Sequence, residues 1–312
     1  MNKREIVLNL LDANTPQETI PAGFFIHFDP RFHFGQAAVD KHLEYFRYTD
    51  MDLVKIQYEI KFPYQPDIQK PSDWGKLPLL TEEFFQPQLA AVEGLVKAAK
   101  HEAVVIVTLY SPFMCARQAS NTLIEQHLRE NLDQAKLGVE IAAESLLNFV
   151  RACIRLGVDG FYTSTQGGER DRFGGSPVFA DCIKPADLLV MNEINQKCLF
   201  NVLHVCDYAY DYDDLTPFLD YPGQVVNVNQ RVGDEMLTGQ TIAEMFKRPF
   251  MGGLDRKGII ATGSPADVQQ EVERVLQQAP SKSFLAADCT LPNEVDWENV
   301  KTAVATAHSY QK

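Results

Sequence analysis

Short apolar runs alternate with longer amphipathic runs along this chain. The apolar runs are rich in Val, Ile, Leu and Phe and lack the strict alternation of a half-exposed strand. This pattern is typical of strands that are buried on both faces of a parallel sheet. We expect such strands at Gly23–Phe28, Leu53–Tyr58, Val104–Leu109, Gly160–Thr163, Val202–Cys206, Val225–Asn229, Pro249–Gly253 and Phe284–Ala287.

The longer runs predict helices. Ser264–Asp267 supplies an N-cap serine, a proline at the first helical position and an acid at the third. Leu128–Leu156 predicts one long helix or two, and Gly157 suits its carboxyl-terminal cap. Trp297–His308 predicts a final amphipathic helix, and the amphipathic segment Met1–Asn14 predicts an N-terminal helical extension.

Eight strands that alternate with helices favour a (β/α)₈ TIM barrel over an open, doubly wound sheet. We therefore expect an α/β fold with a single barrel domain over residues 1–312. Chemistry in such a barrel takes place at the carboxyl ends of the strands. The candidate functional residues are those that end or follow each predicted strand.

Charge and composition exclude several classes of protein. The 312 residues include 42 acidic and 29 basic ones, which gives a net charge of −13. A field of that sign repels phosphate backbones, and no basic patch offsets it, so we expect no nucleic-acid partner. No apolar run approaches the roughly 18 residues of a membrane span. Six scattered cysteines and no signal-peptide core predict the reducing cytoplasm.

The triplet His204-Val205-Cys206 is the sharpest chemical signal. Residues two apart on a strand point to the same side, so an imidazole and a thiol meet at the end of this strand. Cys289 ends the last predicted strand and supplies a second thiol at the same mouth. Two sulfurs and one nitrogen suit Zn²⁺, and three protein ligands leave a fourth position open for substrate. The alternative is that these residues pack the core, because cysteine is among the most buried residue types.

Other residues at the mouth are less specific. Glu59, His27 and Glu169 are candidates for a fourth ligand or an acid–base role, and each could equally be a solvated or salt-bridged loop residue. The aromatic segment Tyr208–Tyr212 could line a corrinoid or substrate face, or could form a structural loop. We interpret the remaining cysteines as packing residues; they are Cys115, Cys153, Cys182 and Cys198.

The chain resembles the uroporphyrinogen decarboxylase superfamily over nearly its whole length. The order and spacing of several segments together carry this resemblance. These segments are Ile20–Phe24 with His27–Phe28, Ser111–Phe113, Gly157–Gly160, Leu203–Cys206, Gly252–Asp255 and Ala287–Pro292.

The decarboxylase branch of this superfamily is the weaker match. It carries an Arg-Gln-Ala-Gly-Arg signature that grips the carboxylates of a porphyrinogen, whereas this chain has only Arg31 after the first predicted strand. That branch also keeps an Asp after the second strand, where this chain has Glu59. Near the last strand it tends to carry Gly-His-Gly, where this chain has Asp288-Cys289-Thr290.

The corrinoid-dependent methyltransferase branch matches at the decisive positions. The resemblance implies that His204, Cys206 and Cys289 are zinc ligands, with the corrinoid (cobalamin) supplied by a partner protein. It implies methyl transfer between that corrinoid and a thiol or another small acceptor or donor. Two alternatives stay open: a cofactor-independent uroporphyrinogen decarboxylase of porphyrin biosynthesis, and a corrinoid- or tetrapyrrole-binding chaperone that has lost catalysis.

Overall fold

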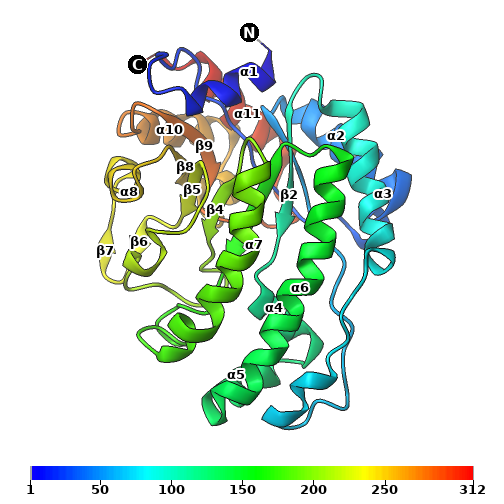
Figure 1. Cartoon of the computed structure of the whole chain (residues 1–312). Helices are drawn as coiled ribbons and strands as arrows, with labels where there is room; N and C mark the ends of the chain where they lie inside the picture. The colour runs from blue at the N-terminus through cyan, green and yellow to red at the C-terminus, as the bar shows by residue number, and fades with distance from the viewer. Residues whose placement is uncertain (1, 312) are drawn as a thin grey trace.

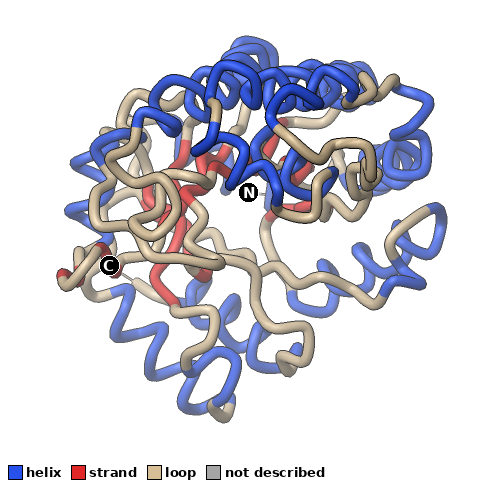
Figure 2. The backbone as a smooth tube through the Cα atoms, turned by 90° about the horizontal axis from the view of Figure 1, so that it is seen from below, coloured by secondary structure: helices blue, strands red, loops and turns tan. Residues whose placement is uncertain are grey.

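A curved sheet of parallel strands organises the structure, a computed structural model that describes residues 2–311. Its seven strands follow one another in the order β1-β2-β3-β4-β5-β8-β9, and helices surround them (Figures 1 and 2). The strands are β1 (Leu53–Ile56), β2 (Val104–Leu109), β3 (Gly160–Thr165), β4 (Val202–Val205), β5 (Val225–Val228), β8 (Phe250–Leu254) and β9 (Ser283–Ala287). A two-stranded hairpin, β6 (Arg231–Val232) and β7 (Glu235–Met236), lies outside this sheet. Seven of the eight predicted strands are thus confirmed, and their ends differ from the predicted ones by at most two residues.

The strand predicted at Gly23–Phe28 is wrong as a regular strand. The segment is extended, and the one strand-like pairing near it is an isolated parallel bridge between Ala22, the residue before it, and Leu285 of β9. On the other side, the backbone N–H of Asp52, just before β1, donates to the carbonyl of Ala22 at 3.0 Å. The segment therefore runs between the two edge strands of the sheet without forming a ladder with either.

Hydrogen bonds to other partners explain why no ladder forms there. The carbonyl of Phe25 accepts from the backbone N–H of Leu291 at 2.8 Å. The carbonyl of Ile26 accepts from the Gln57 side chain at 2.8 Å. A carbonyl that is bonded to a loop or a side chain satisfies its requirement without a neighbouring strand.

Helices fill the segments between the strands. They are α1 (Lys3–Leu8), α2 (Gly35–Thr49), α3 (Glu82–Ala99), α4 (Pro112–Ala119), α5 (Leu123–Glu130), α6 (Leu132–Leu156), α7 (Lys184–Lys197), α8 (Gly239–Phe246), α9 (Ile259–Thr262), α10 (Pro265–Leu276) and α11 (Trp297–Ser309). The predicted Leu128–Leu156 run breaks at Asn131, whose extended backbone ends α5 and whose side chain caps α6. Gly157 caps α6 with φ +92°, and Ser264 and Asp267 form the capping box of α10.

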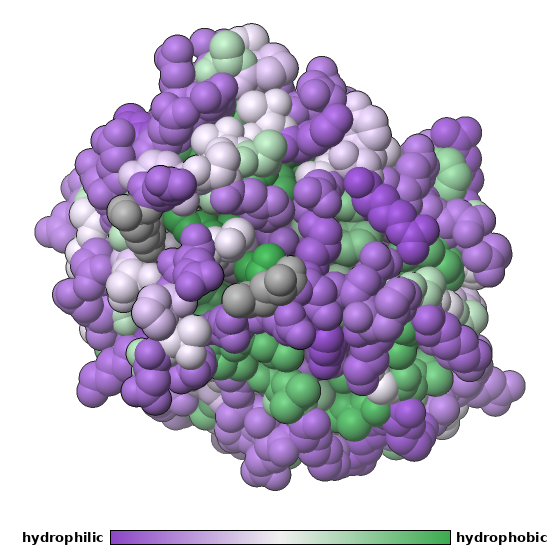
Figure 3. All heavy atoms as spheres, turned by 90° about the horizontal axis from the view of Figure 1, so that it is seen from above, coloured by the Kyte–Doolittle hydropathy of each residue, from purple (hydrophilic) through white to green (hydrophobic). Residues whose placement is uncertain are grey.

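The inner face of the sheet has its own core. Alternate strand residues such as Leu53, Val202 and Phe284 pack there as one cluster, which Val7 and Leu10 join from α1 and the turn that follows it. The N-terminal extension thus covers the amino end of the strands. Figure 3 shows the end of the molecule at which the amino-terminus lies as largely hydrophilic, with hydrophobic patches between. None of the helices within residues 2–311 is both long and apolar enough to cross a membrane.

Candidate metal centre

Strand β4 brings His204 and Cys206 to the inner side of the sheet. His204 is 2% exposed and lies in register with Ser164 of β3 and Asn227 of β5. Cys206 follows the strand directly, and its backbone N–H continues the ladder by donating to the Thr165 carbonyl at 3.1 Å. The extended backbone therefore continues to Cys206, and the two side chains fall on one side as the strand period requires.

Cys289, two residues after β9, completes the group. Its Sγ lies 3.9 Å from the Cys206 Sγ and 3.5 Å from the His204 Nε2. The three donor atoms all lie within 4.8 Å of one another, and all three residues are buried. The structure therefore brings the three residues that the sequence singled out to a single point.

These distances fit a tetrahedral metal ion. With bonds of about 2.3 Å to sulfur and about 2.0–2.1 Å to nitrogen, the edges of a tetrahedron are about 3.8 Å between two sulfurs and about 3.6 Å between sulfur and nitrogen. Two of the three observed separations, 3.9 Å between the sulfurs and 3.5 Å from the Cys289 sulfur to the His204 nitrogen, match these edges. The third, between Cys206 and His204, lies within 4.8 Å. Burial alone explains the presence of cysteine, but it does not explain why two thiols and an imidazole converge at this spacing.

The two thiols also interact directly. The hydrogen bond between them raises the pKa of Cys206 and lowers the pKa of Cys289, because one proton serves both sulfurs. The side-chain amide of Gln166, just after β3, donates to the Cys206 Sγ at 3.4 Å. Gln166 therefore holds the Cys206 side chain in place. The sequence placed Gln166 after a predicted strand but did not predict this contact.

His204 is held by packing rather than by a second hydrogen bond. Its ring lies against the Tyr162 ring, with centroids 4.9 Å apart. Its Nδ1 is buried and has no hydrogen-bond partner within the described chain. The Tyr162 hydroxyl in turn bonds to Asn227 at 2.5 Å, so the ring that supports His204 is itself anchored.

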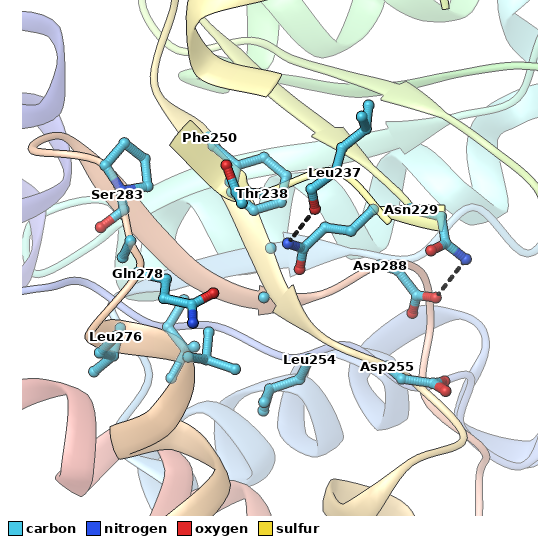
Figure 4. A pocket seen from close by; sticks show the side chains of 18 of the residues that line it. Asn229, Leu237, Thr238, Phe250, Leu254, Asp255, Leu276, Gln278, Ser283 and Asp288 are labelled. Atoms are coloured by element: carbon cyan, nitrogen blue, oxygen red, sulfur yellow. Dashed lines mark hydrogen bonds between the residues drawn. The ribbon is translucent and has the colours of Figure 1, made fainter. Parts of the chain in front are cut away.

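A carboxylate–amide–carboxylate bridge links the residues next to the two cysteines. The Asn229 side-chain amide donates to Asp207, which follows Cys206, at 2.6 Å. The same nitrogen donates to Asp288, which precedes Cys289, at 3.2 Å. Figure 4 shows Asn229 and Asp288 facing each other at one end of a pocket. Burial raises the pKa of Asp288 to about 6.

That pocket lies between β5, β8, β9, α10 and the β6–β7 hairpin. Its volume is about 560 Å³, which is within the range of small-molecule sites. Asn229, Asp255 and Asp288 form its polar end, and side chains such as Leu237 and Phe250 line the remainder (Figure 4). The pocket therefore adjoins the bridge beside the cysteines.

The structure pairs His27 with Glu59 at the mouth. The His27 Nδ1 lies 2.9 Å from the Glu59 Oε1, and the His33 Nδ1 lies 3.8 Å from the other carboxylate oxygen. Neither His27 nor Glu59 belongs to the three-residue donor group found among residues 2–311. Glu169 is a buried, salt-bridged residue, because its carboxylate pairs with Arg172 at 2.9 Å and both side chains are almost fully enclosed.

Lys55 is an unexpected charged residue beneath the mouth. Its ammonium lies 4.5 Å from the Phe25 ring centre and 4.7 Å from the Tyr162 ring centre, and it donates to Gln57 at 2.8 Å. Burial lowers its pKa to about 7. The sequence did contain a signal, because Lys55 and Gln57 are polar residues two apart in an otherwise apolar strand.

The other four cysteines lie away from this group. Cys115, Cys153 and Cys182 are buried and Cys198 is half-buried. Burial raises the pKa of the Cys182 thiol to about 12 and that of Cys198 to about 11, so both remain protonated. This agrees with their interpretation as packing residues.

Comparisons with known proteins agree with the fold. The chain resembles a methyltransferase from Methanosarcina mazei, with a TM-score of 0.78 at 14% identity over 98% of each chain. It resembles a B12-independent methionine synthase from Shewanella sp. W3-18-1 less closely, with a TM-score of 0.59 at 9% identity over 93% of this chain and 97% of that one. No curated protein matches the sequence.

At these identities the solved structures establish the fold alone. A sequence model of one family, described as uroporphyrinogen decarboxylase (URO-D), matches residues 34–310. This match spans every strand of the sheet and all three residues of the donor group. The chain therefore belongs to the uroporphyrinogen decarboxylase family.

Proposed function

We propose that this protein is a zinc-dependent methyltransferase that moves a methyl group between a corrinoid on a partner protein and a thiol or another small acceptor or donor. The convergence of His204, Cys206 and Cys289 within 4.8 Å carries this proposal. The similarity to the Methanosarcina methyltransferase supports it at the level of the fold.

His204, Cys206 and Cys289 would hold the metal, and the fourth position would face the mouth. When bound there, zinc would lower the pKa of a substrate thiol and favour the thiolate at neutral pH. Gln166 and Tyr162 orient Cys206 and His204.

We assign His27 and Glu59 an acid–base role at the mouth. The Glu59 carboxylate would accept from the His27 Nδ1–H, which leaves Nε2 free to take a proton. The His27 side chain is 32% exposed, so a substrate can reach it, whereas the Glu59 side chain is 10% exposed. In thiol methylation the thiol proton would go to His27, the sulfur would take the methyl group, and cobalt would keep the electron pair of the broken bond.

The contacts of the segment between the edge strands support a closed barrel. Ala22 bonds on one side to β9 and on the other to the residue before β1. We infer that residues 20–28 complete a (β/α)₈ barrel and that residues 1–312 form one domain. A closed barrel would bring the ends of β4 and β9 to a common mouth.

Uroporphyrinogen decarboxylation is the less favoured alternative. Arg31 is the one arginine in the loop between the segment at residues 20–28 and α2. Its side chain is 74% exposed, and the carboxylate that it approaches is Asp29 at 3.7 Å. A porphyrinogen presents many carboxylates, each of which needs a cationic donor when it is buried. No cluster of such donors was evident in the sequence at the mouth.

Zinc content tests the proposal first. We expect about one zinc per chain in protein purified without a histidine tag, and loss of the metal in Cys206→Ser and Cys289→Ser. Cys198→Ser is the matched control, because this half-buried thiol lies outside the donor group. Metal retention in both site variants would reject the ligand assignment.

Methyl transfer is then measured with methylcobalamin and simple thiols. The zinc-loaded protein should convert methylcobalamin in the presence of a thiol, and His27→Ala should slow this conversion without loss of zinc. Efficient conversion of uroporphyrinogen by metal-free protein would reject the methyltransferase and favour the decarboxylase.

A further inference from the structure

Arg256 lies between the two segments that carry the cysteines. Its backbone N–H donates to the Asp288 carboxylate at 2.8 Å, one residue before Cys289. Its Nη2 donates to the Tyr208 carbonyl at 3.3 Å, two residues after Cys206. The Tyr208 ring covers the guanidinium at 4.5 Å. These contacts place a positive charge beside the candidate metal centre.

This charge is buried and has no carboxylate partner. Arg256 is 8% exposed, yet no carboxylate within residues 2–311 approaches it to the 4.0 Å of an ion pair. Arg172 is buried to a similar degree, but it pairs with Glu169 at 2.9 Å. A guanidinium offers five N–H donors, and the Tyr208 carbonyl takes one of them from Arg256. None of its other N–H groups is among the fully enclosed donors without a partner in residues 2–311, so they stay open to a ligand from outside the chain. A carboxylate there would supply the ion pair that Arg256 lacks.

We propose that Arg256 binds a carboxylate on the small molecule whose sulfur reaches the metal position. The inference rests on the proposed function and specifies its substrate class as a thiol, or its methylated form, that carries a carboxylate. A guanidinium binds a carboxylate through two parallel hydrogen bonds, which would fix the direction of the attached sulfur.

The charge of the surroundings makes this recognition selective. The protein has a net charge of −13, and Asp207 and Asp288 lie beside the cysteines. An anionic ligand needs a local cation to enter such a site. Lys55 cannot take this part, because Phe25, Tyr162 and Gln57 already enclose its ammonium.

A competing role for Arg256 is to offset the charge of the neighbouring carboxylates. Arg256 does act against the effect of burial on Asp207, whose pKa burial raises. If Arg256 only offset these charges, its replacement would change the metal affinity and the stability of the protein but not its preference among thiols. The two roles therefore predict different results in one experiment.

Three thiols in which two methylene groups separate the sulfur from the polar group distinguish the charge of the ligand from its size. 3-Mercaptopropionate is anionic, 2-mercaptoethanol is neutral and 2-aminoethanethiol is cationic. Protein loaded with Co²⁺ in place of zinc reports thiolate binding as a charge-transfer absorption, and titration gives a Kd for each thiol. The wild type should bind 3-mercaptopropionate about ten-fold or more tighter than 2-mercaptoethanol, because charge-assisted hydrogen bonds are strong.

Arg256→Gln should remove this preference and leave the Kd of 2-mercaptoethanol unchanged. Arg256→Lys should keep part of the preference for the anionic thiol, because lysine retains the positive charge but cannot form two parallel hydrogen bonds to a carboxylate. Metal content is measured first in every variant, which tests the proposed function separately. An Arg256→Gln variant that still prefers the anionic thiol would overturn the inference, as would a wild type without preference.

Calorimetry of metal-free protein provides an independent measurement. Propionate should bind wild type more tightly than Arg256→Gln, because the carboxylate contact does not need the metal. Equal affinities would count against the inference even if the protein never takes up a metal ion.

Discussion

The side chain of Asn229 links the two residues that adjoin the cysteines of the donor group. One amide nitrogen bonds to the carboxylate after Cys206 and to the carboxylate before Cys289. Without this donor, Asp207 and Asp288 would face each other as like charges with less to hold them. We therefore expect the 3.9 Å separation of the sulfurs to depend on a residue that makes no hydrogen bond to either of them.

Asn229→Asp should weaken zinc binding about ten- to hundred-fold, as is common when groups that orient metal ligands are replaced. The substitution removes the donor and adds a third carboxylate. Zinc affinity is measured by competition with a chromophoric chelator, and the Co²⁺ spectrum reports the ligand geometry. Asn195→Asp, near the end of α7, is the matched control with the same change of charge, because Asn195 only accepts a bond from Gln224. Equal affinities in the two variants would contradict the role of Asn229.

At the scale of residues, the sequence predicted the donor group better than its surroundings. The strand period alone places His204 and Cys206 on one side, so their proximity follows from local geometry. The neighbouring roles of Arg256 and Asn229 depend on contacts between segments far apart in the chain. No local pattern encodes such contacts, so these residues could not be assigned from the sequence.

The extended segment at residues 20–28 shows the limit of prediction at the scale of elements. Its apolar pattern matches that of the observed strands, and the segment does lie between the two edge strands of the sheet, β9 and β1. The carbonyls of Phe25 and Ile26, however, bond to Leu291 and to the Gln57 side chain. Burial was therefore predictable from the pattern, whereas the hydrogen-bond partner was not.

Helix α7 contains a buried acid that links stability to pH. Asp187 is fully buried; Thr165 of β3 donates to its Oδ2 at 2.5 Å, and Tyr221 donates to the same oxygen at 3.2 Å. Its Oδ1 has no partner among the described residues. Burial raises its pKa from 3.8 to about 7. Between these values the folded state binds more protons than the unfolded state, so the free energy of unfolding falls as pH rises.

Asp187→Asn should remove this dependence. The variant should gain stability relative to wild type as pH rises from about 4 to about 7, by at most about 4 kcal/mol, and the difference should level off above that. Urea unfolding of both proteins at several pH values gives the difference directly, and groups that titrate in both proteins cancel. A difference that stays constant over this range would show that Asp187 is ionised in the folded protein throughout.

At the scale of the whole molecule, the donor group joins strands that are not neighbours. Strands β5 and β8 lie between β4 and β9 in the sheet, so His204 and Cys206 reach Cys289 across the mouth. A bound ion would therefore tie together the middle and the end of the sheet. The amino end of the strands, by contrast, is already covered by α1.

Metal binding should therefore stabilise the entire fold. A ligand that binds only the folded state at about 1,000 times its Kd adds about 4 kcal/mol to the free energy of unfolding. For a chain of this size that corresponds to a rise of several degrees in thermal midpoint. Scanning calorimetry of the wild type with zinc and after chelation should show this rise, and Cys198→Ser should show it too. Cys289→Ser should show none, because the site would lack the ligand that links β9 to β4. A zinc-dependent rise that persists in Cys289→Ser would mean that the ion stabilises the protein through a different set of residues.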